Sequence, residues 1–409
     1  MGKDSEKNLV GQPIFKQIIK MLPREQFDLL VKQCGSDRYY KTLFSWEQLI
    51  IMLFGIFSRC DSMGEVCDGM RALSGKLNYL GMDCAPSKST AGDALRDRNE
   101  ELFRLYYFAL ITYFRPLLSV SRKAKVSFEE FYAFDSTTIT LFSQVMKGVG
   151  RNPKGDGKKK GGLKVHMLTD VHADTAVFAK ISEAKMHDKK FLAYLNPGKG
   201  SMLVFDKAYN YYTQFADWTQ EGVNFVCRLK DNAKAQLQDV IFEKTLGKGD
   251  SGVYKVEHIH LDYKKDKQEK TVCLRLVYYK DEKGRKFKFI TNNWEITAEE
   301  VALIYKYRWT IETTFKKLKQ NFQLHFFYSE TENGIKTQVW CTLIAHLLLT
   351  VIRAISKSKK AFSTVAALIR IHLISHLDIK WVVVEGRKAY TQRKKGRNKS
   401  PTAIQTSLF

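Results

Sequence analysis

The chain has 409 residues and a formal net charge of +24, and 44% of its residues are hydrophobic. That much apolar surface excludes a wholly disordered chain, and the length suggests two or three domains. The excess of 67 Lys and Arg over 43 Asp and Glu predicts a polyanionic partner, with nucleic acid as the first choice.

Membrane and secreted proteins are disfavoured by three features. No apolar segment follows the charged residues 1–7, so no secretory signal is predicted. The most apolar run, 339–352, is shorter than the roughly 20 residues of a membrane span and contains His346, so we expect a buried helix and no membrane partner. Seven scattered cysteines without a CxxC pair indicate reduced thiols and a cytoplasmic protein.

Residues 1–125 are expected to be all-helical, because apolar side chains recur there with helical spacing. The expected long helices cover 14–22, 26–34, 46–57 and 101–118.

Two shorter helices are expected between the long ones. One begins with a capping box at Ser62 and runs through Ala72, and another begins near Pro86 and runs through Arg98. The second helix would expose Lys88, Arg96 and Arg98. Such a pair is compatible with a helix-turn-helix that binds DNA, although many helical bundles contain one. Lys88 and Arg96 are therefore candidate DNA contacts.

The pattern changes from helix to strand near residue 127, and residues 126–338 predict a mixed α/β sheet. The expected order is β-β-β-α-β-α-β, with strands at 131–135, 163–170, 176–183, 201–206 and 224–229 and helices at 189–195 and 212–221. Residues 231–285 are rich in Lys, Gln and Asp, which indicates an inserted β-rich subdomain, and a strand at 286–291 returns to the core. Residues 339–409 form a C-terminal region that is helical to about 377, with a strand at 381–384 and a basic tail.

Two apolar runs of this region end on a carboxylate. Asp135 follows Ala133-Phe134, and Asp206 follows Val204-Phe205. A carboxylate at the end of a buried strand loses hydration energy unless it is paired, and a divalent metal could pair with both. The alternative is that each aspartate only caps the turn after its strand.

A long helix is expected from Thr297, where a capping box with Glu300 begins it, to about Lys319. At about 100° per residue, four of its polar side chains fall within roughly 60° of arc: Tyr305, Arg308, Glu312 and Lys319. The alternative is a solvated face with Glu–Arg pairing worth a few tenths of a kcal/mol. That alternative accounts for the charges but not for a tyrosine and an acid among cations.

The spacing Tyr-x₂-Arg-x₃-Glu-x₆-Lys resembles the signature of the transposases typified by insertion sequence four. Asp135 and Asp206 lie where that family's first two catalytic aspartates would lie. Residues 206–209, Asp-Lys-Ala-Tyr, look like its segment of Asp, Arg or Lys, Gly or Ala, and Tyr. The resemblance implies a ribonuclease H-like mixed sheet with a β-rich insertion, preceded by an all-helical DNA-binding region. It also implies an Asp135-Asp206-Glu312 catalytic triad that cleaves and rejoins DNA.

The same resemblance implies a cofactor and partners. The triad would hold two Mg²⁺ ions about 4 Å apart, for which Mn²⁺ could substitute. Arg308 and Lys319 would clamp phosphates, and Tyr305 would donate a hydrogen bond to one. The substrates would be the double-stranded terminal inverted repeats of a bacterial insertion sequence and its target DNA, bound by a homodimer on paired ends in the cytoplasm, at the nucleoid.

Two other functions remain open at this stage: a catalytically silent, transposase-derived DNA-binding repressor, and a structure-specific nuclease of the same fold. A pure DNA binder gains nothing from three carboxylates that repel phosphates in the absence of metal.

Weaker signals concern single residues and segments. The basic loop 147–160 could track phosphates, and Trp294 could stack on a displaced base, although a core position is the simpler expectation. His166 is expected in the core, and His187 with Asp188 could be a polar pair near the site or a helix cap. His258 and His260 alternate on an expected strand, and without further ligands no metal site is expected there.

Overall fold

The computed structural model describes residues 11–73, 75–118, 125–140, 162–183, 188–247, 249–322 and 326–384. The chain divides into two compact units, residues 1–98 with 341–409 and residues 99–340. The predicted limit at 125 therefore lies inside the second unit, which also contains helix α6 (Glu101–Leu118). The basic loop 147–160, His187 and the tail beyond 384 lie outside the described residues.

The first unit is helical, as its sequence predicts. Its helices are α1 (Ile14–Ile19), α2 (Arg24–Cys34), α3 (Ser45–Ser58), α4 (Met63–Arg71), the 3₁₀ helix η2 (Leu77–Leu80), α5 (Lys88–Asp97), α11 (Phe362–Ile371) and α12 (Ile379–Val384). The side chains of Ser62 and Ser87 cap α4 and α5 by accepting backbone N–H groups. The expected strand at 381–384 is wrong. Asp378 accepts the N–H of Trp381 at 2.8 Å and starts a helix there, which outweighs the strand propensity of three valines.

The expected helix-turn-helix is not seen in its standard form. Residues 72–87, which include η2, separate α4 from α5, whereas the standard motif has a turn of three or four residues.

Arg98 is buried instead of exposed, which corrects a second expectation. Its side chain is 0% exposed and donates to backbone carbonyl oxygens of Ser36 at 3.1 Å and Leu43 at 2.8 Å. It also donates to Gln48 and lies over the ring of Tyr40. The guanidinium thus pairs with acceptors from the α2–α3 loop and from α3.

The second unit contains one nine-stranded sheet in the order β3-β2-β1-β4-β5-β9-β8-β7-β6. Its strands are β1 (Phe131–Thr140), β2 (Gly162–Asp170), β3 (Thr175–Glu183), β4 (Met202–Phe205), β5 (Asn224–Arg228), β6 (Ala235–Glu243), β7 (Gly252–Lys265), β8 (Gln268–Lys280) and β9 (Lys286–Thr291). Strands β1, β4 and β5 are parallel to one another, and the other pairs are antiparallel.

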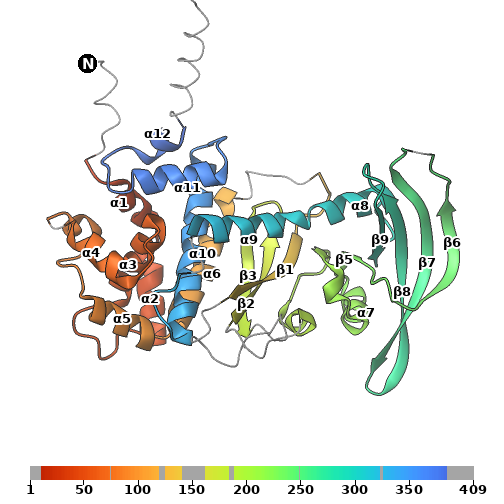
Figure 1. The fold of residues 1–409 in the computed structure, drawn as a ribbon. Helices are drawn as coiled ribbons and strands as arrows, with labels where there is room; N and C mark the ends of the chain where they lie inside the picture. Colours follow the sequence, from red (N-terminus) through yellow and green to blue (C-terminus); the bar gives the residue numbers. More distant parts are fainter. Residues whose placement is uncertain are drawn as a thin grey trace, which may run out of the picture. The chain divides into compact units, whose positions relative to one another are not determined.

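The predicted order of the core elements is confirmed. Helix α7 (Tyr212–Glu221) has the predicted limits, while η3 (Asp188–Tyr194) is a 3₁₀ helix and a second one, η4 (Lys207–Tyr209), follows β4. The β-rich insertion is not a separate subdomain, because β6, β7 and β8 extend the same sheet (Figure 1).

The expected long helix is interrupted. It is present as α8 (Ala298–Lys306) and α9 (Trp309–Phe322), with a turn at Tyr307 and Arg308 between them. The predicted capping box is confirmed, since Thr297 and Glu300 each bond the other's backbone N–H. Both helices pack on one face of the sheet, α9 over β1 and β2 and α8 over β4, β5, β9, β8 and β7.

The opposite face of the sheet carries the hydrophobic core of this unit. Phe134, Phe205, Trp218 and Phe225 are among its fully buried side chains, and α7 contributes Phe215. His166 is confirmed as a core residue, because it is 0% exposed and its Nε2 lies 3.1 Å from the hydroxyl of Ser182.

Helix α10 (Glu332–Ile355) is long and apolar enough to cross a membrane by length and composition alone. However, 78% of its most apolar stretch is buried inside the protein. Val339, Leu343 and Leu348 are each no more than 2% exposed, which confirms the expected buried helix.

Candidate active site

Asp135 and Asp206 are set side by side by the parallel pairing of β1 with β4. The paired register of these strands ends at Ala133 opposite Val204, so the next two residues of each strand continue as neighbours. Successive side chains point to opposite faces, and Phe134 and Phe205 stack in the core with ring centroids 4.4 Å apart. The carboxylates therefore emerge on the other face, which α8 and α9 cover.

Glu312 is linked to Asp135 through Arg308. The guanidinium lies 2.7 Å from Glu312 Oε1 and 3.6 Å from Asp135 Oδ2. The Arg308–Glu312 pair alone is what a solvated helix face would give. The contact with Asp135 goes beyond that alternative, and only 10% of the Arg308 side chain is exposed.

Tyr305 contributes from the last turn of α8. Its hydroxyl donates to Asp206 Oδ1 across 3.5 Å, and its ring packs on Phe289 with centroids 4.6 Å apart. Burial raises the pKa of this phenol, so the hydroxyl remains a donor at neutral pH. The turn between α8 and α9 places Tyr305 above Asp206 and Arg308 beside Asp135.

The carboxylates repel one another at close range. Burial raises the pKa of Asp135 to about 6, and the negative charges of Asp206 and Glu312 add to the rise, against a hydrogen bond from Ser136 and the charge of Arg308. A carboxylate held in this way is stabilised when a further cation arrives.

The donor set suits a hard divalent cation. Each aspartate uses one oxygen to accept the next backbone N–H, Asp135 from Ser136 at 2.7 Å and Asp206 from Lys207 at 2.6 Å. These bonds orient the carboxylates through Oδ1 and leave Oδ2 of each for a cation, which at Asp135 is Arg308 at 3.6 Å. Carboxylate oxygens are the ligands that Mg²⁺ prefers in proteins, so the residues present fit such an ion.

Lys319 lies further along α9. Its Nζ donates to the carbonyl oxygen of Thr138 at 3.3 Å, three residues beyond Asp135 on β1. The four residues of the sequence pattern therefore all face β1 and β4, although α8 and α9 are separate helices.

Lys88 and Arg96, the DNA contacts predicted in the first unit, are separate from the carboxylate site. Lys88 is exposed at the start of α5. Arg96 is exposed but forms ion pairs of 2.8 Å with Asp93 and 2.7 Å with Asp97, which reduce the positive charge that it presents.

Trp309 is a residue that sequence reasoning missed. Its side chain is 60% exposed at the start of α9, and its ring centroid lies 5.6 Å from the guanidinium carbon of Arg308. The signal available was its position directly after Arg308. Trp294 is 46% exposed, so the expected core position is wrong, and its ring packs against His258.

Comparison with known proteins identifies the family. Residues 126–348 match the family described as "Transposase DDE domain". The chain belongs to this family. Residues 10–83 match a domain of unknown function.

The chain is also similar to several bacterial transposases. It is 25% identical over 201 residues to a putative transposase of Sinorhizobium fredii, covering 48% of this chain and 55% of the relative. It is 26% identical over 216 residues to the probable transposase of insertion sequence element IS5377 from Geobacillus stearothermophilus, covering 53% and 54%. The chain thus spans about half the length of these two relatives. The transposase of IS231D from Bacillus thuringiensis is 22% identical over 374 residues, covering 78% and 75%.

Among solved structures, a piggyBac transposase synaptic complex with hairpin DNA matches with a TM-score of 0.43 and 12% identity. The match covers 96% of this chain and 85% of that one. Likeness at this level does not establish a shared fold.

Proposed function

We propose that this protein is the transposase of an insertion sequence, which cuts the ends of its element and joins them to target DNA. The observation that carries the proposal is the convergence of Asp135, Asp206 and Glu312 on one face of the sheet, within a chain of the transposase DDE-domain family. The three carboxylates come from two parallel strands and one helix. Tyr305 and Arg308 contact aspartates that lie about 100 to 180 residues earlier in the sequence.

The finer family and fold are part of the same proposal. The order β3-β2-β1-β4-β5, with β1, β4 and β5 parallel, supports a ribonuclease H-like core. The Tyr305-Arg308-Glu312-Lys319 spacing supports membership of the insertion-sequence-four group.

Asp135, Asp206 and Glu312 would hold divalent metal, for which Mg²⁺ is our choice and Mn²⁺ a substitute. When bound, two such ions supply an activated oxygen nucleophile and charge stabilisation at the phosphorus. The remaining tasks belong to side chains of this protein. Tyr305 orients Asp206 through its hydroxyl.

Arg308 neutralises Asp135 and Glu312 when no substrate is bound and would turn its planar fork to a DNA phosphate when the carboxylates bind metal. Lys319 would add a point charge beside the backbone of β1, and the exposed ring of Trp309 would stack on an unpaired base next to the cut.

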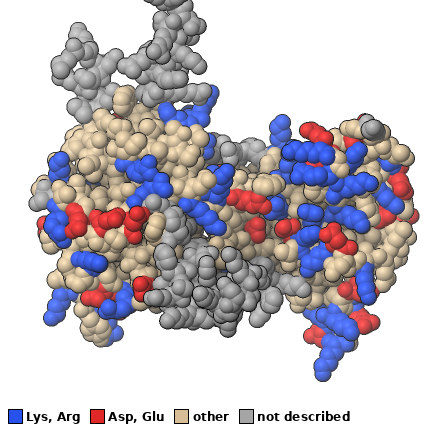
Figure 2. All heavy atoms as spheres, viewed as in Figure 1, with Lys and Arg blue, Asp and Glu red and all other residues tan. Residues whose placement is uncertain are grey.

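Binding of double-stranded DNA would use basic surfaces outside the triad. Figure 2 shows Lys and Arg side chains gathered over the β6–β9 end of the sheet, with Asp and Glu between them. The helices of residues 1–125 would contact the terminal repeats, with Lys88 available for a phosphate and Arg96 less so because of its ion pairs. We expect a homodimer on paired ends, in the bacterial cytoplasm.

The test is cleavage of DNA that carries the element's own ends, with Mg²⁺ and with chelator. Glu312→Gln and Asp206→Asn keep the side-chain shape and remove the charge. We expect cleavage to fall by about 10³-fold or more, because several kcal/mol of charge stabilisation are lost. Glu299→Gln is the matched control, since Glu299 is exposed on α8, and it should cut normally.

Each outcome has a distinct meaning. Unchanged cleavage in Glu312→Gln would overturn the triad. Binding of the ends without any cutting by the wild type would support a silent repressor, and cutting without preference for the ends or strand transfer would support a structure-specific nuclease.

A further inference from the structure

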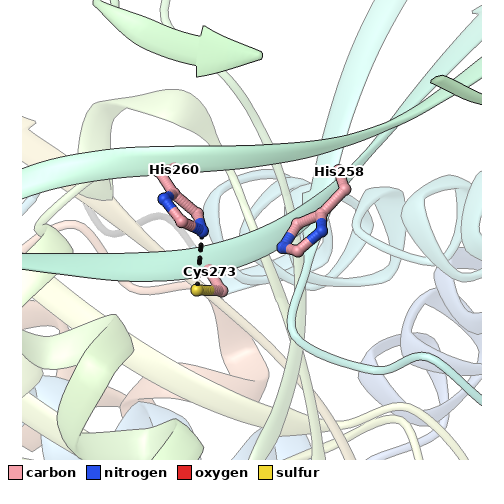
Figure 3. Close-up of side chains that lie close together, drawn as sticks. All are labelled: His258, His260 and Cys273. Carbon is pink, nitrogen blue, oxygen red and sulfur yellow. Dashed lines mark hydrogen bonds between the residues drawn. The ribbon is translucent and has the colours of Figure 1, made fainter. Parts of the chain in front are cut away.

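A second group of metal-ligating side chains lies on β7 and β8, away from the carboxylates. His258 and His260 project from β7 toward Cys273 on β8 (Figure 3). One ligand atom from each of the three lies within 4.8 Å of the others. His260 Nε2 and Cys273 Sγ are already 3.0 Å apart.

Strand pairing explains why these three residues meet. His260 is directly opposite Cys273 in the antiparallel register, and His258 is opposite Arg275. Alternate residues of the same strands, Ile259 and Leu274, are buried in the core on the other face. The cluster therefore lies on the sheet face that α8 covers, where Val256 and Val277 are buried.

The His258 side chain has an unused ligand atom. Its Nε2 is buried and has no hydrogen-bond partner among the residues that the structure describes. The ring packs edge-on against Trp294 with centroids 5.1 Å apart and against His260 at 5.4 Å. A buried imidazole nitrogen without a partner costs free energy, and a bound cation would remove that cost.

We propose that His258, His260 and Cys273 form a transition-metal site, with Zn²⁺ as the ion it fits. Two imidazoles and one thiolate are the ligands that Zn²⁺ takes in proteins, usually in tetrahedral geometry. Ligand atoms around such an ion lie about 3.5 Å apart, so small side-chain rotations bring the 4.8 Å set into range. Cys273 is exposed, which leaves the fourth position to water.

Such an ion would fasten β7 to β8 beside the segment that leads into α8. Trp294 touches His258, and Arg275 donates to the carbonyl oxygen of Ile296 at 2.5 Å. Ile296 directly precedes the capping box at Thr297 that starts α8. The site would therefore stabilise the start of the helix that carries Tyr305, without taking part in phosphodiester chemistry.

The experiment is a Zn²⁺ titration of the full-length protein against a chromogenic chelator, with Cys273→Ser and His258→Gln as variants. Loss of an outer partner of a metal ligand already costs 10–100-fold in affinity, so we expect each variant to lose at least about 100-fold. Zn²⁺ also binds carboxylates, and the titration is therefore repeated in Glu312→Gln, which should keep the tight site.

Alkylation of the thiols gives a second measurement that does not depend on activity. Zn²⁺ should protect Cys273 from iodoacetamide, while exposed Cys84 serves as the control within the same chain and should react equally with and without Zn²⁺. Mg²⁺ should protect neither thiol, because it does not bind thiolates.

Three results would overturn the site. They are the absence of tight Zn²⁺ binding by the wild type, equal affinity in Cys273→Ser, or unprotected alkylation of Cys273 at saturating Zn²⁺. Fast alkylation of Cys273 that depends on His260 but not on Zn²⁺ would instead indicate a thiol–imidazole pair. Chelator-treated variants should keep the thermal stability of the chelator-treated wild type, which separates loss of metal from loss of fold.

Discussion

Among the residues that the structure describes, two arginines are buried, Arg98 in the first unit and Arg308 in the second. They differ in what they bond, and we use the difference to separate a structural cation from a proposed functional one. Arg98 donates to backbone carbonyls and to Gln48, at positions set by the helical fold, and it also forms a longer ion pair of 3.3 Å with Asp37. Arg308 bonds to Asp135 and Glu312, and its Nε has no partner among the described residues. If the guanidinium moved away from the buried carbonyl oxygens, they would lose their donor, which costs free energy. Carboxylates can exchange a guanidinium for another cation.

The largest effect is expected from replacing Glu312 or Asp206, because in the proposed function those residues would hold the metal ions. If cleavage survived in Glu312→Gln, Arg308 would be a structural cation like Arg98, and the comparison would fail.

Replacing Arg98 should have the largest effect on stability. Arg98→Met leaves buried acceptors unpaired, and we expect the free energy of unfolding of the first unit to fall by about 3–5 kcal/mol. Hydrogen exchange of the α3 amides measures this loss locally. Arg96→Met is the control two residues away, and because Arg96 is exposed, its effect should stay below about 1 kcal/mol. Equal protection of α3 in the wild type and Arg98→Met would contradict the structural role.

Replacing Arg308 should affect activity more than stability. Arg308→Met removes the proposed phosphate ligand, and a lost donor of this kind costs about 10²–10³-fold in rate. It also leaves Asp135 and Glu312 without their cation, so added Mg²⁺ should raise the melting temperature of the variant more than that of the wild type. If the variant cleaved DNA normally and Mg²⁺ raised its melting temperature no more than that of the wild type, Arg308 would have a structural role like that of Arg98.

The pH dependence follows from Asp135, whose pKa is raised by burial to about 6, compared with about 3.9 in an unfolded chain. Because the folded state binds this proton more tightly, stability of the metal-free protein should fall as pH rises from about 4 to 6, by up to about 2–3 kcal/mol. Thermal unfolding in chelator measures this trend, and Asp135→Asn should abolish it. Mg²⁺ affinity should show the opposite trend and weaken below about pH 6, since protons compete with the metal.

The smallest effect is expected for Lys319. Lys319→Gln removes one proposed phosphate contact, so the slope of log affinity for DNA against log salt should decrease by about 1. Stability should change by less than about 0.5 kcal/mol, because the side chain is exposed. An unchanged salt slope would show that Lys319 does not contact DNA.

The sequence predicted those parts of the site that depend on local periodicity. Phe134-Asp135 and Phe205-Asp206 alternate on strands, and a strand period of two directly implies that each aspartate opposes a core phenylalanine. Helical spacing likewise grouped Arg308 with Glu312. The turn at Tyr307 and Arg308 was missed, because both flanking segments have helical patterns and nothing local marks the break.

Contacts between segments that are distant in the chain could not be predicted from local sequence patterns. The burial of Arg98 depends on backbone carbonyl oxygens that lie 55 and 62 residues earlier in the chain. A basic residue at the end of a helix is usually exposed. The partner of His260 is set by the register of the β7–β8 hairpin, and a one-residue shift would turn Cys273 to the other face. For this reason the sequence alone supplies no third ligand for His258 and His260.

The discontinuity of the first unit has a consequence for the order of events during synthesis. The N–H groups of Ile14 and Phe15 in α1 donate to the carbonyl oxygens of Ser375 and Leu373, and Gln17 bonds Leu377 and Ile379. These partners lie more than 300 residues later in the chain. The ribosome adds about 5–20 residues per second, so α1 is synthesised well before them. The sheet can thus form on the nascent chain before α1 has its final partners. A product stopped ahead of residue 373 would carry Asp135, Asp206 and Glu312 with an incomplete first unit.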